Sequence, residues 1–150
     1  MTSRHDVRRL DPTQTHDLRR RVLRGGDPDA AVEWPGDDDP DAVHLGVVAG
    51  GRVVAVSTWR PSPAPDGRPG VRLRGMATEP DLAGRGHGRA LLVAGVERAR
   101  SLGAEVAWAH ARVSALGFYE RAGWTALGPV FETPDTGLPH RVVVLELGDR

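Results

Sequence analysis

Three alternate glycines constrain this chain more than any other feature of its sequence. The stretch Gly84–Arg89, which reads GRGHGR, lies between an expected strand at Val71–Thr78 and an expected helix at Ala90–Ala99. Glycine adopts backbone conformations that other residues avoid, so a tight curl can turn successive N–H groups toward one anion. The positive end of the following helix favours negative charge at the same place. The stretch therefore predicts a phosphate-binding loop, with a purely structural glycine turn as the alternative.

Two well-known glycine loops fit this stretch poorly. A Walker loop needs Gly-Lys-Ser/Thr, but all 20 basic residues of the chain are arginine. A dinucleotide fingerprint needs Gly-x-Gly-x-x-Gly, whereas the spacing here is Gly-x-Gly-x-Gly. It also belongs after the first strand of a parallel unit, and here an expected hairpin comes first. Nucleoside triphosphate and dinucleotide binding are therefore not expected.

The rest of the chain predicts a mixed α/β sheet in one domain, residues 1–150. The clearest local pattern is a β-hairpin, in which two β-branched runs, His44–Ala49 and Arg52–Trp59, flank a Gly-Gly pair. The other expected elements, in chain order, are a strand at 4–10, a helix from an N-cap at Asp11 to Gly25-Gly26, a Pro/Asp-rich loop at 27–41, a strand at 105–110, a helix at 112–122, a short strand at 124–127 and a final strand at 141–147.

Composition excludes several classes of protein. The chain has no cysteine, so disulfides and thiolate metal sites are impossible, and no His/Asp/Glu set has metal-ligand spacing. The net charge is zero, which gives no general attraction to nucleic acid or to a membrane surface. No apolar segment approaches a membrane span or a secretory leader, so a soluble cytoplasmic protein is expected. The Arg19–Arg24 and Asp37–Asp41 charge runs are expected to be solvated.

Two segments resemble the signatures of the GNAT family of N-acetyltransferases. Residues 76–92 resemble its acetyl-coenzyme A motif, Arg/Gln-x-x-Gly-x-Gly/Ala at a strand-to-helix junction. Residues 115–124 resemble its second signature, Ala-x-x-Phe-Tyr-x-x-x-Gly-Phe. The two stand in the family's order and at its usual separation, and the expected elements match from about residue 5 to residue 147. The resemblance implies a mixed, mostly antiparallel sheet flanked by helices.

The resemblance implies direct transfer of an acetyl group from acetyl-coenzyme A, as cosubstrate, to a primary amine of a small molecule or peptide. No metal, nucleic acid or membrane takes part, and a homodimer is one assembly that the family allows. Main-chain groups of the strand would hold the pantetheine arm, with one N–H polarising the thioester carbonyl. The implied coenzyme-binding residues are Met76, Ala77, Thr78, Gly84, Arg85, Gly86, His87, Gly88, Arg89 and Ala90.

The same resemblance singles out candidate catalytic residues. Tyr119, the single tyrosine, matches the family position whose hydroxyl lies near the coenzyme sulfur and would be the general acid, unless its ring only packs. Glu79 would be the base, directly or through water, unless it is an exposed residue that starts a turn. His44, Glu132 in the loop before the last strand, and His140 are candidates for lining the acceptor cleft.

Departures from the family pattern concern mainly the acceptor side. Ala83 replaces the Arg/Gln that opens the first motif, Arg112 replaces a frequent Asn, and the 27–41 stretch has no counterpart of the family's second helix. A non-catalytic acyl-coenzyme A sensor on the same fold is the alternative, because it would need the glycine loop but not Tyr119. A nucleic-acid binder using the arginine-rich first helix is disfavoured by the neutral charge and the few aromatic residues.

Overall fold

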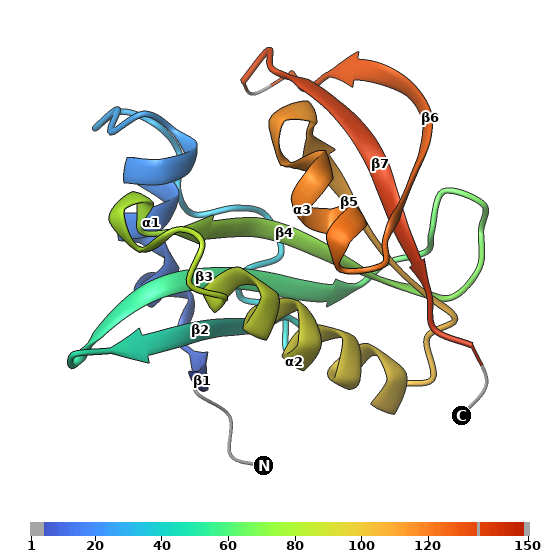
Figure 1. Ribbon diagram of the computed structural model, residues 1–150, viewed down its shortest axis with the longest axis horizontal. Helices are drawn as coiled ribbons and strands as arrows, with labels where there is room; N and C mark the ends of the chain where they lie inside the picture. Colours follow the sequence, from blue (N-terminus) through green and yellow to red (C-terminus); the bar gives the residue numbers. More distant parts are fainter. Residues whose placement is uncertain (1–4, 135, 149–150) are drawn as a thin grey trace. The chain divides into compact units, whose positions relative to one another are not determined.

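The computed structural model describes residues 5–134 and 136–148. Seven strands form a sheet in the order β1-β2-β3-β4-β5-β7-β6, in which β4 and β5 are parallel and the other recorded pairs are antiparallel. This confirms the mixed α/β fold class (Figure 1). The strands are β1 Asp6–Leu10, β2 Val43–Ala49, β3 Arg52–Pro61, β4 Gly70–Thr78, β5 Val106–Arg112, β6 Thr125–Glu132 and β7 Pro139–Glu146, and the main helices are α1 His16–Leu18, α2 His87–Ser101 and α3 Leu116–Arg121.

Contacts divide the chain into two compact units. The first contains Met1–Arg60 and Arg74–Gly95, and the second contains Pro61–Leu73 and Val96–Arg150. In the first unit, the hairpin of β2 and β3 turns at Gly50 and Gly51, where the sequence predicts it. Both glycines have positive φ angles, 59° and 77°, which a two-residue turn between twisted strands requires.

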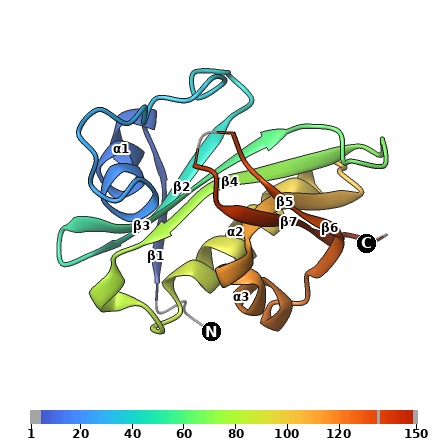
Figure 2. The same ribbon diagram turned by 90° about the horizontal axis from the view of Figure 1, so that it is seen from above.

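The strands of the first unit carry helical segments on opposite faces (Figure 2). On one face, Leu18 of α1 packs with Leu10 and Val56 in a buried cluster. On the other face, Leu91 of α2 packs with Ala55 and Val47. Val56 and Ala55 are neighbours on β3 and therefore point to opposite sides, so both faces of this strand are buried.

The first helical segment differs from the regular helix that the sequence predicts. It begins as a 3₁₀ turn, Pro12–Thr15, continues as the single α-turn α1, and widens into a π-turn at Arg19–Leu23. Gly25 and Gly26 end it with positive φ angles, as expected. The widened turn begins at Arg19, whose side chain is completely buried. An inward-pointing arginine in a run of arginines is not visible in the apolar periodicity of the sequence.

In the second unit, β5 lies between two strands. It pairs in parallel with the Gly70–Leu73 part of β4 and antiparallel with β7, and β6 pairs with β7 as well. The core contains Val106, Trp108 and Val144, and the Trp108 indole donates a hydrogen bond to the Ser62 carbonyl oxygen at 3.0 Å.

Three elements differ most clearly from the expected boundaries. Helix α2 begins at His87, so the second half of the glycine stretch is already helical. The α-helix expected at 112–122 is limited to α3, preceded by a 3₁₀ turn at Val113–Ala115. Strand β6 extends to Glu132, a residue that the sequence pattern places in a loop. Periodicity marks the buried face of an element but not the polar turns at its ends.

Within the described residues, no helix combines the length and the apolar character needed to span a bilayer.

We expect Gly95→Ala to destabilise the first unit strongly. A Cβ atom built at Gly95 would overlap the indole ring of Trp59, a fully buried side chain that has no room to move. Overpacking of this kind costs about 1–3 kcal/mol or more. Urea unfolding measures the loss, with Val93→Ala, at an exposed position of the same helix, as the control. Equal stability of Gly95→Ala and the wild type would show that α2 does not pack this closely on β3.

Candidate functional site

The glycine stretch forms a tight turn that leads directly into α2. A 3₁₀ turn at Pro80–Leu82 precedes it, and Gly84 and Gly86 have φ angles of 82° and 85°. The Ala90 N–H donates to the Gly86 carbonyl oxygen at 3.0 Å and closes the first turn of the helix. The preceding N–H groups of that turn have no partner within the helix. The loop therefore has the backbone geometry and the positive helix end that an anion needs.

His5 and His87 lie against the carbonyl side of this loop. The His5 Nε2 atom is 3.0 Å from the Arg85 carbonyl oxygen, and the two imidazole rings meet edge to face with centroids 5.0 Å apart. Burial, together with the positive potential of His5 and Arg85, lowers the pKa of His87. The His87 imidazole is therefore neutral at pH 7.

The end of β4 leads from a glycine with a positive φ angle to the candidate thioester site. Gly75 has a φ angle of 66° inside the strand, and a Cβ atom there would lie 2.8 Å from the Trp34 ring. Glycine is therefore required at this position, both for the backbone conformation and for the close ring. Met76, Ala77 and Thr78 follow directly, and of these Ala77 is buried in the core of the first unit.

Glu79, the candidate base, is buried and ion-paired. Only 5% of it is exposed, which contradicts the alternative reading as an exposed turn residue. The Arg21 guanidinium donates to both carboxylate oxygens at 2.8 and 2.7 Å, and Arg52 donates at 3.2 Å. The hydrogen bonds from Arg21 lower the pKa of Glu79 below its ordinary value. Glu79 is consequently ionised at neutral pH and is a weak base.

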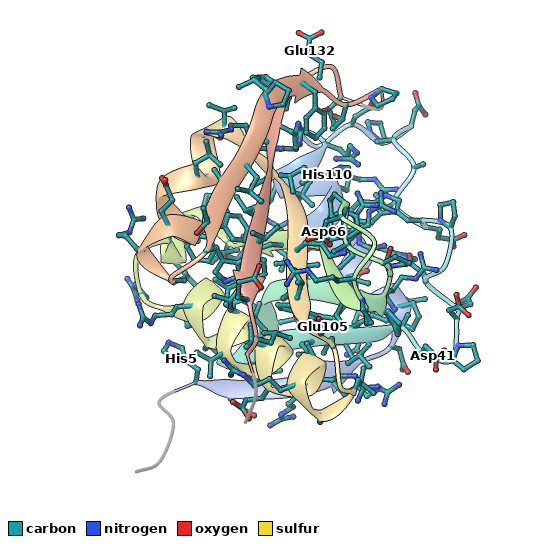
Figure 3. The ribbon with its side chains drawn as sticks, turned by 90° about the vertical axis from the view of Figure 1, so that its right-hand side faces the viewer. His5, Asp41, Asp66, Glu105, His110 and Glu132 are labelled. Carbon is teal, nitrogen blue, oxygen red and sulfur yellow. The ribbon has the colours of Figure 1, made fainter. Side chains whose placement is uncertain are left out.

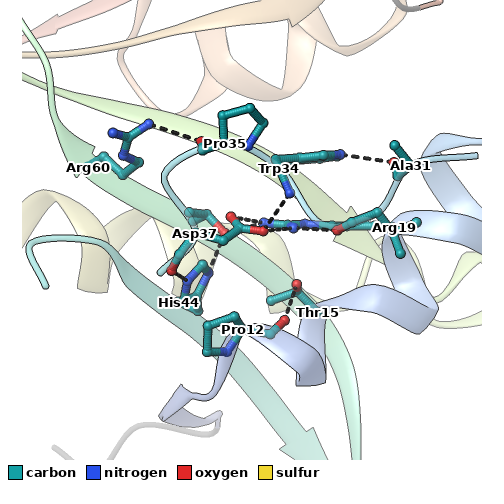
Figure 4. Close-up of polar contacts among 11 residues, drawn as sticks. Pro12, Thr15, Arg19, Ala31, Trp34, Pro35, Asp37, His44 and Arg60 are labelled. Atoms are coloured by element: carbon teal, nitrogen blue, oxygen red, sulfur yellow. Dashed lines mark hydrogen bonds and ion pairs between the residues drawn. The ribbon is translucent and has the colours of Figure 1, made fainter. Parts of the chain in front are cut away.

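Arg19 and Asp37 form a buried ion pair in the first unit (Figure 4). The fully buried Arg19 guanidinium donates to both carboxylate oxygens of Asp37 at 2.6 and 3.1 Å, and also to the Val32 carbonyl oxygen and the Thr58 hydroxyl. Burial alone would raise the pKa of Asp37, but the hydrogen bonds from Arg19 and from the Trp34 N–H outweigh it and lower the pKa.

His44 belongs to this buried cluster. Its Nε2 atom donates to the Asp37 carbonyl oxygen at 3.0 Å, since a carbonyl only accepts. Its Nδ1 atom is 2.8 Å from the Thr58 hydroxyl, which also accepts a hydrogen bond from Arg19. Both ring nitrogens are used within the protein, so His44 can position this cluster but has no nitrogen left for an acceptor.

Two charge runs expected to be solvated are therefore partly buried. One residue of each run, Arg19 and Asp37, is buried, and Arg21 of the first run binds Glu79. Asp38 and Asp39 are exposed, as expected. Nothing in a run of like charges tells which member points inward. The apolar residues Val32 and Trp34, shortly before Asp37 in this Pro/Asp-rich loop, are the signals of burial that the sequence offers there.

Tyr119 and Trp124 pack together in the second unit. Their ring centroids are 5.4 Å apart, and the Phe118 ring meets Tyr119 edge to face with centroids 5.1 Å apart. Only 6% of Tyr119 is exposed, and burial raises the pKa of its hydroxyl. The group therefore keeps its proton at neutral pH, as a general acid must, although the ring packing predicted as the alternative is also present.

The two remaining candidates lie on β6 and β7. His140 is buried, its ring stacks with Phe131 at 6.2 Å, and its Nδ1 atom is 2.8 Å from the Leu138 carbonyl oxygen. Glu132 is exposed at the end of β6 and points away from the strands (Figure 3). Across the residues that the structure describes, no group of three or more His, Asp and Glu side chains could hold a metal ion.

Comparisons with known proteins agree on one family. The family model described as "Acetyltransferase (GNAT) family" matches residues 11–124. The chain is 27% identical over 134 residues to the uncharacterized N-acetyltransferase YitI of Bacillus subtilis (strain 168), an alignment that covers 88% of this chain and 90% of the relative.

Solved structures share the fold. An aminoglycoside 6'-N-acetyltransferase complexed with coenzyme A superposes with a TM-score of 0.76 at 14% identity, covering 97% of this chain and 98% of the other. The ribosomal-protein-S18-alanine N-acetyltransferase of Escherichia coli gives 0.70 at 17% identity, covering 97% and 96%. At these identities the likeness concerns the fold alone, and it confirms the mostly antiparallel sheet.

We expect Asp37→Asn to lower the free energy of unfolding by about 3–5 kcal/mol, because it leaves the Arg19 charge buried without a counterion. Since the pKa of Asp37 is lowered in the folded state, its contribution is complete above the ordinary value of 3.8 and is lost as the pH falls below it. The difference between wild type and variant should therefore shrink below about pH 4. Urea unfolding between pH 7 and pH 3 measures it.

The exposed neighbour Asp38 provides the matched control, since Asp38→Asn removes the same charge from the same loop. Similar stability of the Asp37 and Asp38 variants at pH 7 would contradict a central role for the ion pair.

Proposed function

Because this chain belongs to the acetyltransferase (GNAT) family, we propose that it transfers an acetyl group from acetyl-coenzyme A to a primary amine. Residues 1–150 act as one acetyltransferase domain in this proposal. The observation that carries it is the turn at Gly84 and Gly86, which leads into the first turn of α2 with backbone N–H groups available for an anion. The coenzyme's pyrophosphate is that anion, as the coenzyme A bound to a structural relative suggests.

The proposed site uses main-chain groups for most of its coenzyme contacts. Residues 84–90 bind the pyrophosphate through their N–H groups, and the side chains of Arg85 and Arg89 add charge-assisted hydrogen bonds. Met76, Ala77 and Thr78 bind the pantetheine arm, and one N–H of this segment polarises the thioester carbonyl. No metal ion is needed, since these dipoles stabilise the oxyanion that forms when the amine attacks.

The proposed proton transfers involve Tyr119 and Glu79. The amine attacks in its unprotonated form, and its proton passes to the Glu79 carboxylate directly or through water. Because the pKa of Glu79 is lowered, it remains ionised above about pH 5, and the rise of kcat/KM with pH reports the ionisation of the amine itself. The departing thiolate takes a proton from the Tyr119 hydroxyl, whose raised pKa keeps it protonated.

Thermal-shift titration with acetyl-coenzyme A tests the coenzyme assignment, with ATP and NAD as controls. At about 100 times Kd the ligand should add about 2.7 kcal/mol of stability, or on the order of 5–10 °C for a chain of this length. No shift with millimolar acetyl-coenzyme A would refute the proposal.

A pair of glycine variants makes the titration specific to the loop. Gly84 and Gly67 both have positive φ angles, 82° and 89°, and both have open space where a Cβ atom would go. Ala at either position costs similar backbone strain. Only Gly84→Ala should weaken acetyl-coenzyme A binding.

Tyr119→Phe separates an enzyme from a non-catalytic sensor of acyl-coenzyme A. The variant keeps the ring that packs on Trp124 and loses only the hydroxyl. A general acid contributes about 10²–10⁴-fold, so kcat should fall by that factor while the thermal shift with acetyl-coenzyme A is retained. Steady-state assays with a panel of amines measure this. Unchanged kcat in the variant would assign Tyr119 to packing alone.

A further inference from the structure

Hydrogen bonds divide unequally between the two oxygens of the Glu79 carboxylate. The Oε2 atom accepts from Arg21 Nη2 at 2.7 Å and from Arg52 Nη1 at 3.2 Å. The Oε1 atom accepts from Arg21 Nη1 at 2.8 Å, and the described residues supply no other donor to it. A carboxylate oxygen has about two lone-pair sites. Both sites of Oε2 are therefore used, whereas Oε1 has one site left that can accept a proton.

Arg21, which binds both oxygens, is itself held in one orientation. It belongs to the widened turn Arg19–Leu23, and its Nε and Nη2 atoms donate to Asp17 one turn earlier at 2.7 to 3.1 Å. The other edge of the guanidinium, Nη1 and Nη2, faces Glu79. Because a guanidinium is planar with its donors at fixed angles, the contact with Asp17 also fixes the plane in which Arg21 meets Glu79.

Glu79 lies next to the proposed thioester segment. It directly follows Met76–Thr78 at the end of β4. Its backbone N–H donates to the Val54 carbonyl oxygen of β3 at 2.8 Å, so its main chain is fixed as well as its side chain. A proton acceptor must lie within hydrogen-bond reach of the attacking amine, directly or through one water. The orientation of this carboxylate therefore decides which of its oxygens can take part.

We propose that Arg21 is a positioning residue of the reaction: by binding both oxygens of Glu79 it holds the carboxylate so that Oε1 accepts the proton of the amine. This inference rests on the proposed acetyltransferase function and adds a residue to it. When the amine nitrogen bonds to the thioester carbon, the carbonyl π electrons move to the oxygen and the nitrogen becomes positively charged. The nitrogen then loses a proton to Oε1, and a weakly basic carboxylate suffices because this nitrogen is cationic.

The charges around Glu79 predict how its ionisation depends on Arg21. The groups that face it are Arg21 and Asp17 from the first helical segment and Arg52 from β3. The hydrogen bonds from Arg21 lower the pKa of Glu79 most, whereas burial and Asp17 raise it. Without Arg21, only the largely exposed Arg52 opposes the burial. The pKa of Glu79 should then rise by about 1–3 pH units, the effect of one close opposite charge.

A pH series of kcat/KM for Arg21→Gln and wild type tests the inference. The Arg21 side chain is 42% exposed, so glutamine fits in its place. The ionisation of the amine is the same for both proteins and cancels in the ratio of variant to wild type. We expect a loss of about tenfold or more at pH 8, mainly in kcat, because the carboxylate is no longer oriented. The ratio should fall further toward pH 5, since Glu79 takes up a proton there only in the variant.

Two further variants separate the charge of Arg21 from its geometry. Arg21→Lys keeps the positive charge but loses the planar fork, so its pH profile should resemble that of the wild type while its kcat stays low. Arg8→Gln is the matched control, because Arg8 is an exposed arginine of the same unit that is ion-paired with Asp6. This control should leave both kcat and the pH profile unchanged.

Carbon-13 NMR of protein labelled at the glutamate carboxyl carbons measures the ionisation of Glu79 without turnover. The signal of Glu79 is the one that Glu79→Gln removes. Its titration midpoint should lie below the ordinary value of 4.5 in the wild type. In Arg21→Gln the midpoint should rise by about 1–3 pH units.

Two results would overturn the inference. One is that Arg21→Gln has the kcat and the pH profile of the wild type. The other is that the NMR midpoint rises while the ratio of kcat/KM stays constant from pH 8 to pH 5, which would make Arg21 a purely structural residue. Both leave the acetyltransferase function standing if the wild type acetylates an amine. A wild type that neither acetylates an amine nor gives a thermal shift with acetyl-coenzyme A would instead refute the proposed function, and this inference with it.

Discussion

The buried ion pair between Arg19 and Asp37 organises the first unit. Its two hydrogen bonds join the widened turn after α1 to the loop that precedes β2. These two segments do not belong to one helix or one strand. Burying these charges is expensive, and the structure offsets the cost by giving the guanidinium further acceptors at Val32 and Thr58. The ion pair therefore fixes the position of the Pro/Asp-rich loop. The composition of the loop alone would not fix that position.

Two consequences of the ion pair reach the proposed site. Asp37 accepts the backbone N–H of Trp34, which holds the indole over Arg19 and against Gly75. The widened turn also presents Arg21, two residues after Arg19, to the carboxylate of Glu79 at the end of β4. The loop that contains Trp34 and Asp37 is thus held in place by electrostatics.

Local sequence patterns predict the fold and the coenzyme-binding segment of this chain. The Gly50-Gly51 hairpin, the glycine loop before α2 and the two family signatures each depend on neighbours along the chain, and the fold class and family they indicated are confirmed. The roles of Tyr119, Glu79 and the loop residues stay predictions. Glu79 is neither exposed nor a strong base, because Arg21, 58 positions earlier in the chain, binds its carboxylate and keeps it ionised.

The sequence alone determined which turns need glycine and where the apolar faces repeat, because backbone conformation and periodicity are properties of short segments. It also determined the family, through two motifs in register. Only the tertiary structure decided which arginine of the first helical segment is buried, which aspartate of the following loop meets it, and which side chains gather around Trp34. These features depend on contacts between segments far apart in the chain. A run of identical charged residues does not indicate which member makes such a contact.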